Sequence, residues 1–266
     1  MCPHCRAFID PKEKVCTYCD NPLPKAYGDR VDTGTALRGL IPSTHFTTFI
    51  ILAINFGVFM AMLLLTRKVG ADALWNVDSR VSVLFGAMFR YSIVVDGEWW
   101  RLITAGFLHG GVLHILMNSW VMYDLAASVE QIFETPRFLV IYLVSNVTGF
   151  WFSMATGNVL SVGASAALCG LIGAMLAYAR RSGQSFLWKA YMRWIIMIAI
   201  FGMIFPAIDN AAHFGGLAGG FAVGWLAASN ETNRAIESMW KAAAFAACAI
   251  TAVAFVYAYV GISRAF

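Results

Sequence analysis

The stretch SVGASAALCGLIGAML, residues 161–176, is almost wholly apolar and rich in small residues. Such a composition is typical of a helix that packs closely against other helices. Ser165 lies in this stretch, behind Gly163 and Ala164, at a position where Leu or Val would pack as well. A lone serine in a helix usually bonds back to a carbonyl one turn earlier and has a structural role. The alternative is that Ser165 is a nucleophile, and the answer depends on what else lies at the same depth.

The composition of the chain indicates an integral membrane protein. Of its 266 residues, 59% are hydrophobic and 13% are charged, whereas soluble domains carry about 25% charged residues. A membrane-spanning helix needs roughly 20 mostly apolar residues. The sequence predicts seven spans, at about 46–66, 104–125, 137–157, 163–180, 188–205, 211–229 and 242–262.

The distribution of Lys and Arg predicts the orientation. With a cytoplasmic N-terminus, 13 of the 19 Lys and Arg residues fall on the inner side and six on the outer side. The positive-inside rule therefore places the N-terminus in the cytoplasm. This topology accounts for the net charge of +4, so the charge does not indicate a nucleic-acid partner. The sequence starts with Cys-rich, polar residues, and we expect no cleavable signal peptide.

Three of the predicted spans begin with polar residues, which are costly in a membrane and point to function. The second span opens with His109, His114 and Asn118, the fourth with Ser165, and the sixth with His213. In the predicted topology all three spans start at the outer face, so these residues lie at similar depths. Together they supply a nucleophile, a general base near neutral pH and hydrogen-bond donors for an oxyanion.

Small residues predict close contact between the fourth and sixth spans. In the fourth span they form a ridge at Ala166, Gly170 and Ala174. In the sixth span they form overlapping pairs four residues apart: Gly215/Gly219, Gly216/Gly220 and Gly220/Gly224. Small residues let helix backbones approach closely, and such an approach would bring Ser165 near His213.

At this point the chain resembles the rhomboid family of intramembrane serine proteases, over roughly residues 45–230. The motifs that carry the resemblance occur in order along the chain: Trp100–Arg101, His109, HILMN at 114–118, Glu130, GASA at 163–166 and AHFGGLAGG at 212–220. Several motifs in the correct order on the correct spans are more specific than any one of them.

The resemblance implies a role for each of these residues. Ser165 would be the nucleophile and His213 the base of a two-residue dyad, while His114, Asn118 and the backbone N–H of Ser165 would form the oxyanion hole. Residues 67–103 would form a membrane-associated loop with Arg101 as a structural anchor. Asp209, one turn before His213, is expected not to be a third member.

The resemblance also shows one departure, because the family usually has Gly where this chain has Ala166. The added methyl group is expected to hold the two helices slightly apart or to shift the backbone around Ser165.

Two functions other than proteolysis stay open. One is a non-proteolytic rhomboid-like protein that binds membrane clients. The other is a metal-dependent hydrolase or transporter using His109, His114 and His213, although no HExxH motif is present.

The N-terminal cysteines predict a structural zinc site. CPHC at 2–5 and CTYC at 16–19 are separated by ten residues, a spacing that suits tetrahedral zinc bound by four thiolates. The candidate ligands are Cys2, Cys5, Cys16 and Cys19, and free thiols are the alternative. No cofactor is expected for catalysis.

The sequence thus predicts an all-α polytopic membrane bundle with a rhomboid-like six-helix core. Its expected parts are a zinc-ribbon-like module (1–20), a linker (21–44), the membrane core (45–230) and one additional C-terminal transmembrane helix (231–266). The expected partners are the lipid bilayer and transmembrane protein substrates. The expected location is a bacterial inner (plasma) membrane.

Overall fold

The fold is taken from a computed structural model, which describes Val15, Cys19 and residues 46–68, 75–205, 207–228 and 233–265. The chain divides into two compact units, Met1–Ser43 and Thr44–Phe266. The second unit is mostly helical and holds every helix and strand named below. The predicted zinc-ribbon-like module (1–20) and the predicted linker (21–44) lie almost entirely outside the described residues.

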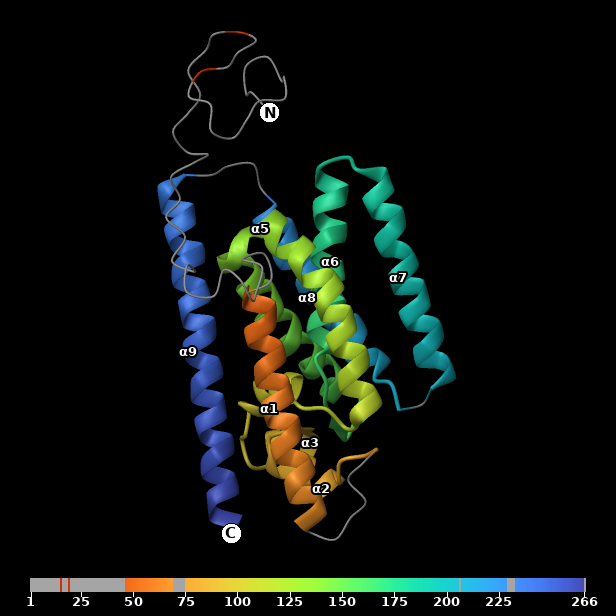
Figure 1. The fold of residues 1–266 in the computed structure, drawn as a ribbon, viewed down its shortest axis with the longest axis vertical. Coiled ribbons are helices and arrows are strands. Elements are labelled where there is room, and N and C mark those ends of the chain that lie inside the picture. The colour runs from red at the N-terminus through yellow and green to blue at the C-terminus, as the bar shows by residue number, and fades with distance from the viewer. Residues whose placement is uncertain are drawn as a thin grey trace. The chain divides into compact units, whose positions relative to one another are not determined.

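The second unit is a bundle of long helices (Figure 1). They are α1 (Phe46–Lys68), α5 (Val112–Ala155), α6 (Ser165–Arg181), α7 (Ser185–Ile204), α8 (Asn210–Ala227) and α9 (Arg234–Ala265). Within the described residues, α1, α5, α7 and α9 are long and apolar enough to cross a membrane. The shorter α6 and α8 are rich in Gly and Ala, and α6 is buried along most of its length. The prediction of a helical membrane bundle is confirmed.

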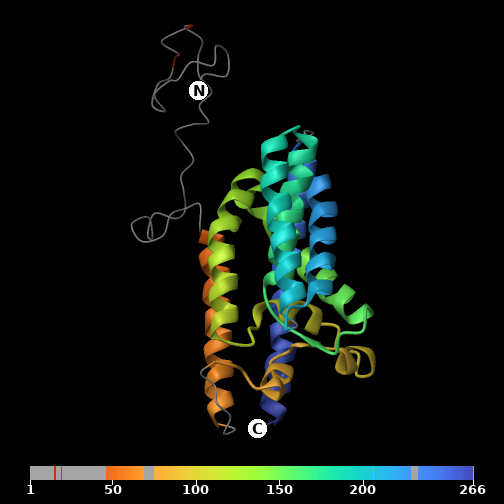
Figure 2. The same cartoon turned by 90° about the vertical axis from the view of Figure 1, so that its right-hand side faces the viewer.

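Helix α5 consists of two helices that meet at a sharp reversal. Glu134 has φ 63° and ψ 159°, and Pro136 follows it in the chain. Proline cannot donate the helical hydrogen bond, and its ring clashes with the preceding turn, so a helix kinks or breaks at such a position. The first half of α5 therefore rises beside α1 and the second half returns through the bundle (Figure 2). The two halves cover the second and third predicted spans.

The predicted start of the second span at residue 104 is wrong, because the long helix begins at Val112. Residues 101–107 instead form two short helices, α4 (Arg101–Thr104) and η3 (Ala105–Phe107). Gly110 and Gly111 separate these from α5. A Cβ at Gly111 would lie 2.1 Å from the carbonyl oxygen of Trp75, so glycine lets the two backbones touch here.

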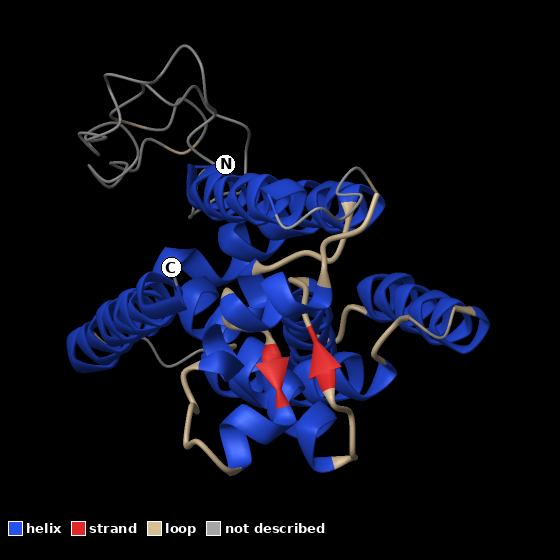
Figure 3. Ribbon diagram, turned by 90° about the horizontal axis from the view of Figure 1, so that it is seen from below, coloured by secondary structure: helices blue, strands red, loops and turns tan. Residues whose placement is uncertain are grey.

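The connection between α1 and α5 is folded against the bundle. It contains α2 (Ser79–Leu84), β1 (Met88–Phe89) and α3 (Arg90–Val94), and β1 pairs antiparallel with β2 (Leu160–Ser161), as Figure 3 shows. Asp78 caps α2, and its hydrogen bonds with Arg80 hold the pKa of the carboxyl group below its usual range. The short sheet fixes this loop to the segment that leads into α6.

Arg101 holds the same loop from within. Its guanidinium is buried, donates to the carbonyl oxygens of Val83 (2.6 Å) and Ala87 (3.3 Å), and pairs with Glu98 at 2.5 Å. These contacts are those of a structural anchor, the role that the family resemblance implies for this residue.

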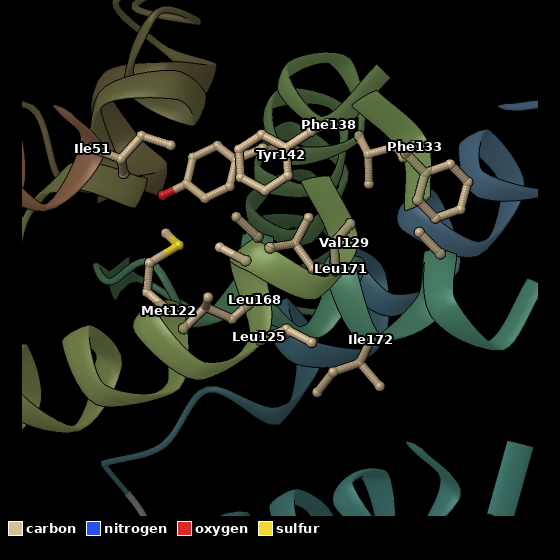
Figure 4. Packing of buried hydrophobic residues seen from close by; sticks show 14 of the residues in the cluster. Ile51, Met122, Leu125, Val129, Phe133, Phe138, Tyr142, Leu168, Leu171 and Ile172 are labelled. Atoms are coloured by element: carbon tan, nitrogen blue, oxygen red, sulfur yellow. The ribbon is translucent and has the colours of Figure 1, made fainter. Parts of the chain in front are cut away.

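The core lies between the two halves of α5 and the central helix α6. Phe138 and Tyr142 from the second half of α5 meet Met122 from the first half and Leu171 from α6 (Figure 4). In contrast, α7 has no buried residue. The helices α5, α6 and α8 all begin at the lower end of the bundle in Figure 1, so the polar residues at their starts share one end, as the sequence predicts.

Candidate active site

The helices α6 and α8 touch backbone to backbone. A Cβ at Gly216 would lie 2.1 Å from the carbonyl oxygen of Ala166, and one at Gly220 would lie 2.0 Å from the carbonyl oxygen of Gly170. Further along, the same helices meet at Gly224, where a Cβ would lie 2.5 Å from the Cα of Ala174. No side chain fits between backbones this close. The predicted contact between the two rows of small residues is confirmed.

Of the two effects expected of Ala166, the separation of α6 from α8 is wrong, and a shift of the backbone around Ser165 stays a prediction. Its methyl group points at Gly149 in the second half of α5, where an added Cβ would lie 2.7 Å from the Ala166 Cβ. The atoms nearest to an added Cβ at Gly216 are backbone atoms of Ala166. The absent side chain at Gly149 therefore accommodates the methyl group without separating α6 from α8.

Ser165 is the first residue of α6, and Gly163 shapes the backbone just before it. Gly163 has φ +127°, which disfavours any other residue, and its N–H donates to the carbonyl oxygen of Ala105 at 2.9 Å. A Cβ at Gly163 would lie 2.6 Å from His114 Nε2 and 3.7 Å from Ser165 Oγ. His114 and Ser165 thus both border the space that a side chain at Gly163 would fill.

His114 presents a defined ring nitrogen to this space. Its Nδ1 accepts a hydrogen bond from the backbone N–H of Gly110 at 3.3 Å. In a neutral imidazole the other nitrogen then carries the proton, so Nε2–H is a donor facing Gly163 and Ser165. Asn118, one turn later, is buried and donates through Nδ2 to the His114 carbonyl oxygen at 3.1 Å. The Nδ2 group of Asn118 has a second hydrogen available for another acceptor.

His213 lies on the first turn of α8. It lines a small cavity together with Cys169 of α6, and Cys169 is one helical turn after Ser165 on the same face. In the register set by the Ala166–Gly216 contact, Ser165 and His213 stand at the starts of two adjoining helices. The structure therefore brings Ser165, His213 and His114 together at one end of the bundle.

Asp209 is occupied by partners other than His213. Its carboxylate accepts hydrogen bonds from Ser153 Oγ, from Asn158 Nδ2 at 2.8 Å and from the Ala212 N–H at 2.9 Å. The Nδ1 atom of His213 is buried and has no hydrogen-bond partner among the residues that the structure describes. Asp209 therefore caps α8 and secures the loop before α6, in agreement with the expectation that it is not a triad member.

Comparison with known proteins identifies the family of the chain. The family model described as Rhomboid domain matches residues 96–230, about half of the chain. The chain belongs to the rhomboid family. The matched segment runs from just before Arg101 to the end of α8 and includes Ser165, His114 and His213.

The relatives of this rhomboid include proteins named as proteases and one named as inactive. It is 37% identical over 149 residues to the Rhomboid protease GluP of Bacillus subtilis, a match covering 55% of this chain and 29% of GluP. It is 32% identical over 147 residues to the Putative rhomboid protease YdcA of the same organism, covering 53% of this chain and 73% of YdcA. Inactive RHOMBOID-like protein 8 of Arabidopsis thaliana is 32% identical over 141 residues, covering 49% of this chain and 39% of that protein. The chain thus spans less than a third of the length of GluP.

His109 of this rhomboid lies beside His114. It is fully buried, and its ring lies 5.1 Å from that of His114 in an edge-to-face arrangement. Within the described ranges, no group of three or more His, Cys, Asp or Glu side chains is placed to hold a metal ion. Of the predicted zinc ligands, Cys2, Cys5 and Cys16 lie outside the described residues, and Cys19 is half-buried. The zinc site therefore stays a prediction.

Polar and small residues on the second half of α5 also support the site, and they were not among the residues predicted from the sequence. Asn146 donates to the carbonyl oxygens of Leu102 (2.9 Å) and Ile103 (3.0 Å) and so holds α4 in place. Gly149 receives the Ala166 methyl group, and Ser153 binds Asp209. The signal was present, because positions 146, 149 and 153 have the spacing of one helix face, and small or polar residues repeat there inside an apolar span.

Proposed function

We propose that this rhomboid is an intramembrane serine protease that hydrolyses peptide bonds in or near the transmembrane segments of other membrane proteins. Ser165 attacks the scissile carbonyl carbon. His213 accepts the hydroxyl proton and returns it to the leaving amine. The acyl-enzyme is then hydrolysed by water that His213 activates in the same way.

The developing oxyanion has three proposed donors. They are the backbone N–H of Ser165, Nε2–H of His114 and Nδ2–H of Asn118. The hydrogen bond from Gly110 to His114 Nδ1 supports this role, since it leaves the proton on Nε2. Preorganised donors of this kind are worth about 10²–10³ in rate each.

The observation that carries the proposal is the backbone contact between Ala166 and Gly216. It supports a dyad because each proposed catalytic side chain stands within one helical turn of the contact, on two helices that begin at the same end. Ser165 and His213 are both half-buried, which is compatible with entry of water and of an unwound substrate segment.

The proposed setting of this enzyme follows from its charges and cysteines. The excess of Lys and Arg on the predicted inner side supports a cytoplasmic N-terminus. With this orientation, the catalytic site lies near the outer face of a bacterial inner membrane. The four-thiolate donor set of Cys2, Cys5, Cys16 and Cys19 is suited to structural zinc. The proposed partners are transmembrane protein substrates and the lipid bilayer.

A serine-directed fluorophosphonate probe tests the proposed chemistry directly. Wild-type protein in detergent should be labelled, and Ser165→Ala and His213→Ala should both lose the label. Ser182→Ala, a serine at the other end of α6, is the matched control and should be labelled like the wild type. Absence of labelling in folded wild-type protein would instead favour the non-proteolytic alternative. One relative, from Arabidopsis thaliana, is named as inactive.

A further inference from the structure

A small cavity lies beside His213. Its volume is about 20 Å³, and it lies between Cys169 of α6, Ile198 and Ala199 of α7, and Asn210 and His213 of α8. A single water molecule needs about 10–15 Å³ of such space and two to four polar partners. The cavity has room for one water molecule.

Two polar atoms on residues that line this cavity lack partners. His213 Nδ1 and Asn210 Oδ1 are both buried and without a hydrogen-bond partner among the described residues. The two residues are three positions apart on α8, which places them on the same helix face. Buried polar groups in proteins are almost always satisfied by protein or by ordered water.

We propose that Asn210 is a positioning residue for His213 and acts through one water molecule in this cavity. His213 Nδ1–H donates to the water oxygen, and the water donates to Asn210 Oδ1. The inference rests on the proposed function, because it assigns the tautomer of the proposed base. With the proton held on Nδ1, the lone pair of Nε2 is free to accept the proton of Ser165.

This arrangement gives the dyad what an aspartate gives a Ser-His-Asp triad, a fixed tautomer and ring orientation. Asp209 does not supply it, since its carboxylate binds Ser153, Asn158 and the Ala212 N–H. The other titratable groups near His213 are His114 from α5 and Cys169 from α6. The α7 side of the cavity is aliphatic.

Helix α7 holds the Asn210 amide in place. The amide lies directly against Gly202, where an added Cβ would be 1.9 Å from Asn210 Oδ1. A side chain at Gly202 would therefore displace the amide. This provides a second variant, which tests the inference without changing Asn210 itself.

The experiment measures kcat, KM and the pH dependence of cleavage of a model transmembrane substrate, together with the imidazole ¹⁵N NMR signals of histidine-labelled protein. The chain has five histidines, and His213→Ala assigns the signal. Asn210→Ala and Gly202→Ala should lower kcat about tenfold with KM unchanged, and should turn the Nδ1–H signal of His213 into that of mixed tautomers. Asn210→Asp keeps an acceptor, so it should retain the Nδ1–H signal and move the acidic limb of the rate profile to higher pH, because a nearby carboxylate favours the imidazolium.

Asn55→Ala is the matched control, since Asn55 of α1 is also buried and its Oδ1 has no partner within the part of the chain that the structure describes. It should leave kcat and the His213 signal unchanged. Asn210→Ala with an unchanged His213 signal would overturn the inference, whether or not the rate falls. The NMR measurement does not require proteolysis, so the role of Asn210 is decided even if the wild-type protein cleaves nothing and the proposed function fails.

Discussion

Replacing Gly216 with Ala should separate the two helices that carry the proposed dyad. The new Cβ would lie 2.1 Å from the Ala166 carbonyl oxygen, whereas ordinary contacts of a Cβ are 3.4–4 Å. The backbones must therefore move apart locally by about 1 Å, since neither contacting atom belongs to a flexible side chain. Overpacking of this kind costs about 1–3 kcal/mol of stability, against a gain of about 1 kcal/mol for Ala over Gly in a helix.

The effect on catalysis should exceed the effect on stability. A displacement of about 1 Å in a catalytic site can cost about 10² in rate, and Gly216 lies one turn after His213. Gly216→Ala should thus lower kcat about 100-fold, while its midpoint of thermal unfolding in detergent falls by only a few degrees. Both are measured on purified protein, by cleavage of a transmembrane substrate and by circular dichroism.

The matched control is Gly261→Ala, a glycine of α9 with nothing within 4 Å of an added Cβ. It should cleave at the wild-type rate and be at least as heat-stable. If Gly216→Ala also keeps the wild-type kcat, the contact between α6 and α8 does not set the catalytic geometry, and the reasoning from packing to mechanism is refuted.

Three further results are expected. Asn118→Ala should slow cleavage by about 10²-fold or less, since one oxyanion donor of three is lost; an unchanged rate would make Asn118 a purely structural residue. Ala166→Gly should be modestly less heat-stable and at least as active, because the methyl group fills space at Gly149 and does not separate α6 from α8; inactivation, measured in the same assay, would show that the methyl group is needed to place Ser165. Cys16→Ser or chelation should release zinc, measured by metal analysis, yet leave cleavage by the membrane core largely intact; parallel loss of zinc and activity would show that the two parts are coupled.

The sequence predicted the helices well where hydropathy and small-residue spacing act within one segment. The runs at 46–66 and 188–205 correspond to α1 and α7, and the rows of small residues in α6 and α8 meet as expected. The start of the second span was misplaced because residues 104–111 are apolar enough to extend a helix. Gly111 instead receives the backbone of the preceding loop at Trp75, a long-range contact that hydropathy does not report.

The candidate site was predictable in its residue types and less so in its surroundings. His114, Ser165 and His213 stand out as polar residues in apolar spans. Local spacing does not determine how separate helices pack. It therefore did not predict that the His114 ring packs against Gly163 or that Ser153 donates a hydrogen bond to Asp209. The contact of the Ala166 methyl group with Gly149 was not predicted for the same reason, because Gly149 belongs to a third helix, α5.

The most direct measurement of the central claim is cleavage of a purified transmembrane substrate in lipid vesicles by wild-type protein and by Ser165→Ala. The wild-type protein should produce two fragments, whose new termini, read by mass spectrometry, lie in or near the transmembrane segment. Folded Ser165→Ala should produce none. Cleavage by Ser165→Ala at the wild-type rate would contradict the account.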